Sequence, residues 1–183
     1  ILFGVAKSQQ SELNDVDAAM DTYEQILILN PEEWAAYDRQ RSIWEEQEDW
    51  NAVLEVLERR LSQSTGAQQR VSLQREMLQI SYEQVADWDR AFSLAATLLD
   101  TDSADSIVRK VLEQMHQDGA AVQRVYDVLY PMLEAAEEWD PLIILSRSHA
   151  QHEDVDLNDA RSALERIYRV QTEISPDPSG AYG

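Results

Sequence analysis

The sequence offers few residues for catalytic chemistry. It contains no Cys, which excludes thiolate nucleophiles and Cys-ligated zinc. Its five Gly residues are isolated, so they cannot form a glycine-rich loop that cradles phosphates. Neither a nucleophile elbow nor a His-Glu-x-x-His helix is present. We therefore expect a protein that is not an enzyme and binds no cofactor.

Two histidines could in principle hold a metal ion. His149 and His152 stand three residues apart and next to Glu153, a spacing that places the two imidazoles on one side of a helix. No second group of ligands accompanies them, and His116 is distant in the sequence. We therefore expect solvent-exposed histidines here and no metal site.

An acidic segment near the C-terminus invites comparison with a calcium-binding loop. Four oxygen-bearing side chains stand at positions 1, 3, 5 and 12 of that pattern: Asp154, Asp156, Asn158 and Glu165. Position 6 requires Gly for a sharp turn, but Asp159 occupies it. The apolar spacing also predicts a helix start at residues 157–160, which would leave no loop of the required length. Acidic residues at a helix start explain the cluster without calcium.

One predicted helix carries a face rich in aromatic and Arg side chains, which often anchor protein interfaces. Its members are Trp34, Tyr37, Arg41 and Trp44. We take them as candidate partner-binding residues, with core packing as the alternative for Tyr37 and Trp44. The other three tryptophans, at positions 50, 88 and 139, each follow an acidic residue and open an apolar series. We expect these three in the core.

Helical periodicity extends over nearly the whole chain. A representative series has apolar residues at i, i+3, i+4, i+7 and i+11: Trp50, Val53, Leu54, Leu57 and Leu61. No stretch shows sustained alternation of apolar and polar residues, so we predict an all-α protein.

An internal repeat organises these helices. Helices are predicted to open after Asp15, Asp49, Asp87 and Asp156, which stand 34, 38 and 69 residues apart. The last interval is about twice the first, and a degenerate copy fits at 119–123. We predict a helical repeat domain over 1–174 of five helix hairpins, roughly 1–29, 32–62, 67–100, 104–136 and 139–173. Residues 175–183 are rich in Pro, Ser and Gly, and we expect a tail or linker there.

The charge of the chain restricts its partners. Fifteen basic against 35 acidic residues give a formal net charge of −20. Such a surface repels phosphate backbones and anionic membranes, and no apolar run approaches the roughly 20 residues of a membrane helix. A protein or peptide partner, especially a basic one, fits this charge.

The spacing of Ala19, Tyr23, Ile26 and Pro31 resembles the second helix of a tetratricopeptide repeat, with Ile26 in place of the usual Ala. The remaining hairpins match more loosely: Arg41 and Gln79 stand where the family has a small Gly. Large acidic bacterial proteins built from divergent repeats of this kind look similar.

This resemblance implies a right-handed α-solenoid whose first helices line a concave groove. Members of the family are typically scaffolds or adaptors that hold a partner segment, which makes the aromatic face at 34–44 a groove candidate. An architectural segment that spaces flanking domains or self-associates is the alternative. The sequence starts at Ile1 inside an amphipathic pattern, so we also expect it to be part of a longer chain.

Overall fold

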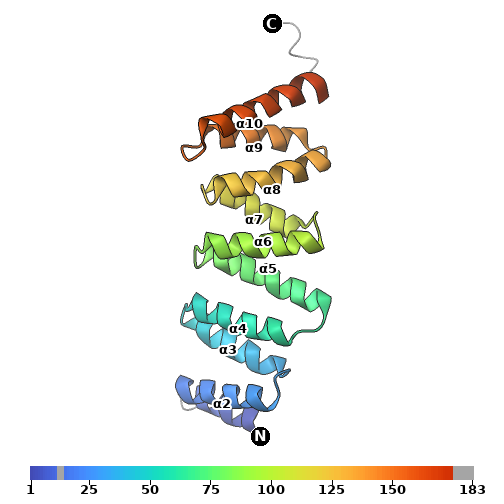
Figure 1. The fold of residues 1–183 in the computed structure, drawn as a ribbon. Coiled ribbons are helices and arrows are strands. Elements are labelled where there is room, and N and C mark those ends of the chain that lie inside the picture. The colour runs from blue at the N-terminus through green and yellow to red at the C-terminus, as the bar shows by residue number, and fades with distance from the viewer. Residues whose placement is uncertain (12–14, 175–183) are drawn as a thin grey trace. The chain divides into compact units, whose positions relative to one another are not determined.

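A computed structural model describes residues 1–11 and 15–174 of the chain. This part is all-α, as predicted, and no strand occurs in it. Its ten α-helices and closing π-helical turn, labelled in Figure 1, are α1 (Leu2–Ser11), α2 (Val16–Leu29), α3 (Trp34–Glu46), α4 (Trp50–Gln63), α5 (Ala67–Glu83), α6 (Trp88–Thr101), α7 (Ser106–Gln117), α8 (Val122–Ala135), α9 (Trp139–Gln151), α10 (Leu157–Arg169) and η1 (Val170–Ile174). The predicted tail at 175–183 lies outside the described residues.

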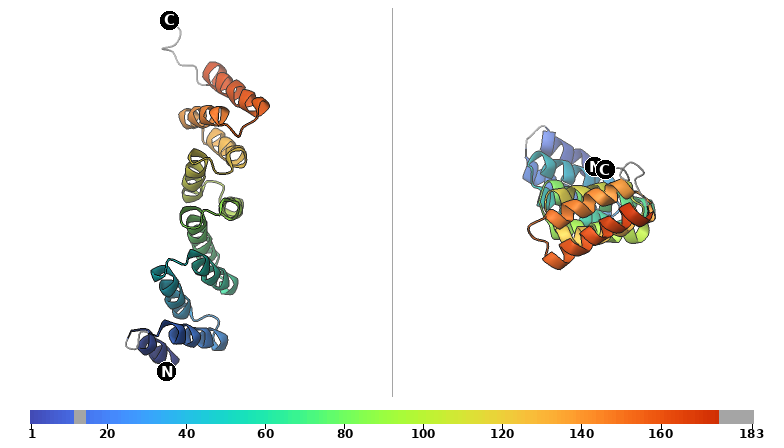
Figure 2. Two further views of the ribbon diagram at one scale, coloured as in Figure 1. Left: turned by 90° about the vertical axis from the view of Figure 1, so that its left-hand side faces the viewer. Right: turned by 90° about the horizontal axis from the view of Figure 1, so that it is seen from above.

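The chain divides into two compact units, Ile1–Asp87 and Trp88–Gly183. The division falls inside the predicted hairpin at 67–100, between its two helices. We call α1, α3, α5, α7 and α9 the first helices and α2, α4, α6, α8 and α10 the second helices. Within each unit, every helix packs against the next one along the chain (Figure 2). Such nearest-neighbour packing is typical of helical repeats.

The core of unit 1 is formed where α1, α2, α3 and α4 meet. Tyr23 of α2 is fully buried and meets Phe3 of α1 edge to face, with ring centroids 5.7 Å apart. Two small residues of the same cluster, Ala19 in α2 and Ala36 in α3, are also fully buried. Ala at these positions lets the helix backbones approach closely.

The core of unit 2 follows the same plan. Fully buried aliphatic side chains come from consecutive helices, among them Leu112 of α7, Leu129 of α8 and Leu142 of α9. The helix α8 continues through Pro131. Each unit therefore buries apolar side chains by stacking its helices in sequence order.

Several helices begin where an Asp caps them. The carboxylate of Asp15 accepts a hydrogen bond from the backbone N–H of Ala18 at 3.0 Å, and Asp49 accepts one from Ala52 at 3.0 Å. Asp156 likewise accepts from the first residues of α10. A capping side chain satisfies backbone donors that have no partner inside the helix. The repeated Asp of the sequence thus fixes where these second helices start.

Candidate functional site

A surface pocket of about 280 Å³ opens in unit 1 between α2, α3 and α4. Its lining residues are Met20, Asp21 and Glu24 from α2, Gln40 and Trp44 from α3, and Ala52, Glu55, Val56 and Arg59 from α4. Most of the lining comes from second helices, whereas the family resemblance implied a groove along first helices. The pocket lining combines apolar side chains with three carboxylates, a mixture suited to a cationic side chain on an apolar segment.

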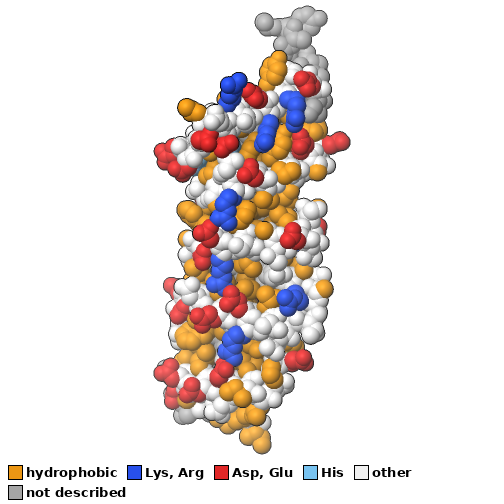
Figure 3. Space-filling model, in the orientation of Figure 1, with side chains coloured by type: hydrophobic (Ala, Val, Ile, Leu, Met, Phe, Trp, Pro, Cys, Tyr) orange, Lys and Arg blue, Asp and Glu red, His pale blue; other side chains and the backbone are white. Residues whose placement is uncertain are grey.

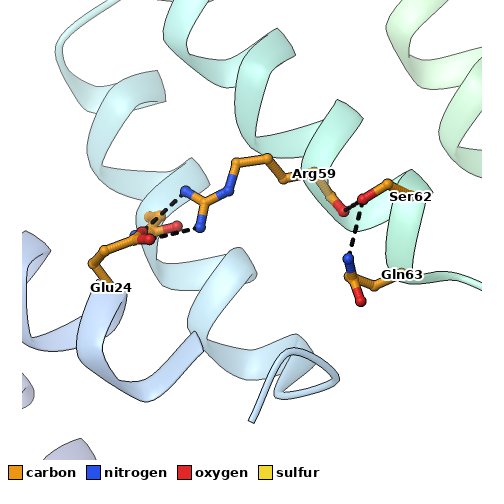
Figure 4. Close-up of polar contacts among 5 residues, drawn as sticks. Glu24, Arg59, Ser62 and Gln63 are labelled. Atoms are coloured by element: carbon orange, nitrogen blue, oxygen red, sulfur yellow. Dashed lines mark hydrogen bonds and ion pairs between the residues drawn. The ribbon is translucent and has the colours of Figure 1, made fainter. Parts of the chain in front are cut away.

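One of these carboxylates is already neutralised. Arg59 donates two hydrogen bonds to Glu24, at 2.8 and 2.9 Å (Figure 4). Gln40 donates a third to the same carboxylate at 3.3 Å. The Arg59 hydrogen bonds hold the pKa of Glu24 below its ordinary value. The pair positions α4 against α2 and leaves Asp21 and Glu55 as the exposed carboxylates that line the pocket.

The structure separates the four predicted partner-binding residues. Trp44 is half-buried: it packs against the core of unit 1 and also lines the pocket. Trp34 stacks on Tyr37 with ring centroids 6.1 Å apart, and the guanidinium of Arg60 lies 5.8 Å from the Trp34 ring. Tyr37 is only 3% exposed, so it is a core residue, which was the alternative that the sequence left open.

Arg41 is held by two carboxylates. Its guanidinium pairs with Glu45 on the same helix at 2.7 Å and with Glu76 of α5 at 2.5 Å. Burial raises the pKa of Glu76, although Arg41 beside it acts in the opposite direction. Arg41 therefore ties α3 to α5, and of the four predicted residues only Trp44 lines the pocket.

Ion pairs connect successive second helices, and the sequence-based predictions did not include them. Glu24 pairs with Arg59 in unit 1, and in unit 2 Asp89 pairs with Arg124 and Glu134 with Arg169. In all three pairs the Arg stands 35 residues after the carboxylate. An acid–Arg spacing close to the repeat length was the signal that could have found them.

The histidines of unit 2 contradict the sequence-based prediction. His149 was expected at the surface, yet it is fully buried. It stacks on the ring of Tyr126 with centroids 3.9 Å apart, and His116 lies 5.8 Å away on α7. Helix stacking brings together two residues that are 33 positions apart, which local spacing cannot reveal.

Burial keeps this histidine pair neutral. It lowers the pKa of His116 to about 4, and it also lowers the pKa of His149. Within the described part of the chain, neither ring nitrogen of His149 nor Nε2 of His116 has a hydrogen-bond partner. The pair is thus a buried polar cluster in an otherwise apolar core.

The acidic segment at 154–165 is a helix start, as the repeat predicted. The helix α10 begins at Leu157, and Asp156 caps it by accepting hydrogen bonds from the N–H groups of Asn158 and Asp159 at 2.7 and 3.0 Å. These backbone donors lower the pKa of Asp156. Across residues 1–11 and 15–174, no group of three or more His, Asp or Glu side chains is arranged to hold a metal ion.

The three tryptophans that were expected in the core differ in burial. Trp50 and Trp139 are half-buried at the first positions of α4 and α9. Trp88 is 42% exposed, so its predicted core position is wrong. It opens α6, and the first residue of a helix lies at the edge of a packed face. None of the helices that the structure describes is long and apolar enough to cross a membrane.

Comparison with known proteins adds no relative: no family model matches the chain, and no curated protein is similar to it.

Proposed function

We propose that this chain is a non-catalytic, tetratricopeptide-like protein-interaction module whose pocket on α2, α3 and α4 binds an apolar partner segment carrying Lys or Arg. One observation carries the proposal: the indole of Trp44 lies in the same pocket as the carboxylates of Asp21 and Glu55. Trp offers a large apolar contact surface, which is why it is frequent among the residues that dominate binding.

The charges of the pocket select the partner. With Glu24 occupied by Arg59, Asp21 and Glu55 are the carboxylates that can meet an incoming ammonium or guanidinium group. A net charge of −20 attracts basic segments from a distance, and this attraction weakens as salt screens it. The partner is therefore expected to be a protein or peptide with basic and apolar side chains close together.

The test uses a fluorescein-labelled peptide of alternating Leu and Lys pairs, with a matched peptide that has Glu in place of Lys. Fluorescence anisotropy should show binding of the Lys peptide only, and the affinity should fall between 50 and 500 mM salt. Joint replacement Asp21→Asn and Glu55→Gln should lower the affinity about tenfold, because each exposed ion pair contributes up to about 1 kcal/mol. Trp44→Ala should lower it further.

A matched control removes two carboxylates from unit 1 outside the pocket. Glu32→Gln together with Glu46→Gln makes the same change in net charge but should alter the affinity less than about twofold. Equal losses in the two double variants would show that only the overall charge attracts the peptide. Unchanged binding after Trp44→Ala would contradict the proposed site.

An architectural role remains the second candidate function. It is favoured by an uncovered apolar face on α10, where Leu157, Leu164 and Tyr168 are exposed.

A further inference from the structure

The histidine pair of unit 2, His116 and His149, brings three helices together. His116 belongs to α7 and His149 to α9, and their ring centroids are 5.8 Å apart. His149 also stacks on Tyr126 of α8, with the two ring planes only 9° from parallel. His116 is 3% exposed and His149 is fully buried. Two side chains that can take up a proton therefore lie inside the packing of α9 on α7 and α8.

The closed core offers no partner to a protonated imidazole. In the described part of the chain, Nε2 of His116 and both ring nitrogens of His149 are buried without a hydrogen bond. A charged imidazole donates from both nitrogens, and burying a charge without partners is costly. Stacking on Tyr126 offsets little of this cost, because the attraction of a cation to an aromatic face is much weaker than its hydration. The pair can therefore be charged only when its nitrogens reach water.

The charged groups around His149 do not change this conclusion. Asp127 of α8 and Asp159 of α10 favour a positive charge on His149, whereas Arg166 of α10 and His152 oppose it. Burial is the largest influence, and it lowers the pKa of His149 despite the two carboxylates. Acidic side chains are visible over the surface of α9 and α10 (Figure 3), so a histidine that reached solvent would find counter-charges there.

A third histidine acts on the pair. His152 follows α9, is only partly buried and lies against the loop between α7 and α8: a Cβ on Gly119 would come within 3.0 Å of its Nε2. Burial lowers the pKa of His116 most, and His149 and His152 lower it further. A charge on one histidine therefore disfavours a charge on the next one while unit 2 is closed.

We infer that the histidine pair is an acid-sensitive switch, which opens unit 2 by separating α9 from α7 and α8 while unit 1 stays folded. The imidazoles reach water only if α9 leaves these two helices. Because α10 packs on α9, the two helices should move together. All three histidines of the chain lie in unit 2, so unit 1 has no group of this kind. Helical repeats can open locally, since their contacts join neighbouring helices.

The expected size of the response follows from His116. Its pKa is about 4 in the folded chain and about 6.5 when exposed. The open state binds the proton first, so the advantage of the closed state is complete above pH 6.5 and is lost as the pH falls toward 4. Between pH 7.5 and 5 the ratio of open to closed unit 2 should rise about thirtyfold through His116 alone. His149, whose pKa is also lowered, should add to this rise.

Hydrogen exchange of the full chain, followed by mass spectrometry at pH 7.5 and pH 5, tests the switch. After correction for the intrinsic pH dependence of exchange, protection of peptides from α7 to α10 should fall at least about thirtyfold. Peptides from α2 to α4 should change less than about threefold, and a return to pH 7.5 should restore protection. An equal fall in both units, no fall in unit 2, or an irreversible fall would overturn the inference.

Variants assign the response to the pair. His116→Met combined with His149→Leu removes both titratable groups and keeps apolar volume in the core. Its protection at pH 5 should stay within about threefold of its value at pH 7.5. His116→Met alone should remove about thirtyfold of the fall, and it serves if the double variant does not show native circular dichroism at pH 7.5.

The matched control is His152→Gln, which removes the partly exposed histidine and leaves the pair in place. This control should lose protection at pH 5 as the native chain does. Histidine-pair variants that open like the native chain, or a control that no longer opens, would show that the pair is not the switch.

Discussion

The two units differ at one position of the repeat. The eleventh residue of the first helix is Trp44 in α3 and Met77 in α5, both in unit 1. In unit 2 the same position holds His116 in α7 and His149 in α9. The members of each pair stand 33 residues apart. The same repeat position thus has large apolar side chains in unit 1 and titratable side chains in unit 2.

The residue at this eleventh position determines whether the position lines a surface pocket or is buried in the core. In α3 of unit 1 the position supplies a pocket wall, because Trp44 is half-buried between the core and the surface, whereas Met77 of α5 is only 3% exposed. In unit 2 both residues are buried: His149 is stacked on Tyr126 and has no solvent exposure, and His116 is 3% exposed. We therefore expect unit 1 to respond to partners at this position and unit 2 to respond to pH.

The largest effect on stability should come from removing the buried side chain of His149. His149→Ala should lower the free energy of unfolding by about 3 kcal/mol, because it leaves a cavity beside Tyr126. His149→Leu should recover most of this loss, since both ring nitrogens lack hydrogen-bond partners among the described residues. Urea denaturation followed by circular dichroism measures both. A Leu variant as unstable as the Ala variant would show that the ring nitrogens have partners.

A smaller effect should follow from protonation of His116. Its pKa is about 4 in the folded chain and about 6.5 when exposed, so the unfolded state binds the proton first as the pH falls. The contribution of neutral His116 is fully present above pH 6.5 and is lost progressively as the pH falls toward 4. Between pH 7.5 and 5 the loss should be about 2 kcal/mol.

The measurement for His116 is a comparison with His116→Met, which places at this position the residue that α5 carries there. Urea denaturation at pH 7.5 and at pH 5 should show a stability loss for the native chain that exceeds the loss for the variant. The comparison is needed because protonation of carboxylates near the pI of 4.3 also changes stability by relieving repulsion. Equal pH dependence in the two proteins would mean that His116 titrates normally.

The helix caps should contribute less. Asp49→Ala removes the hydrogen bond to the N–H of Ala52 at the start of α4 and should cost about 1 kcal/mol. Asp49→Asn keeps an accepting oxygen and should cost less than half of that. Thermal unfolding of the two variants is sufficient to distinguish them. Equal losses for Asn and Ala would assign the effect to charge rather than to capping.

The smallest effect should come from the ion pairs between second helices. A double-mutant cycle on Glu24 and Arg59 in unit 1 should give a coupling of about 0.5 kcal/mol, since the pair is bidentate but partly exposed. Asp89 and Arg124 in unit 2 are more exposed and should couple less strongly. A stronger coupling in unit 2 than in unit 1 would contradict this ranking.

The helices could be predicted from sequence because their signals are local. Apolar spacing and capping Asp residues such as Asp49 and Asp156 act within one or two helical turns. The burial of His149 could not be predicted in this way, because neighbouring helices bury it and they come from distant parts of the sequence. The exposure of Trp88 has the complementary cause, since it lies at the end of its apolar face.

The candidate site was only partly predictable for the same reason. An aromatic helix face was visible at residues 34–44, but its pattern could not show that Tyr37 faces the core while Trp44 reaches a pocket. The carboxylates beside Trp44 come from α2 and α4, so they required knowledge of which helices lie together. Applied to all residue types, the repeat spacing would have paired His116 with His149 and Glu24 with Arg59.

The most direct test of the proposed function is an NMR titration of the full chain, labelled with ¹⁵N, with the Leu–Lys peptide. We predict that amide shifts gather around the pocket of unit 1, near residues 20–24, 40–44 and 52–59. Amides near His116 and His149, at the equivalent position of unit 2, should not move. Shifts spread equally over both units, or centred on the histidines, would contradict a binding site at Trp44.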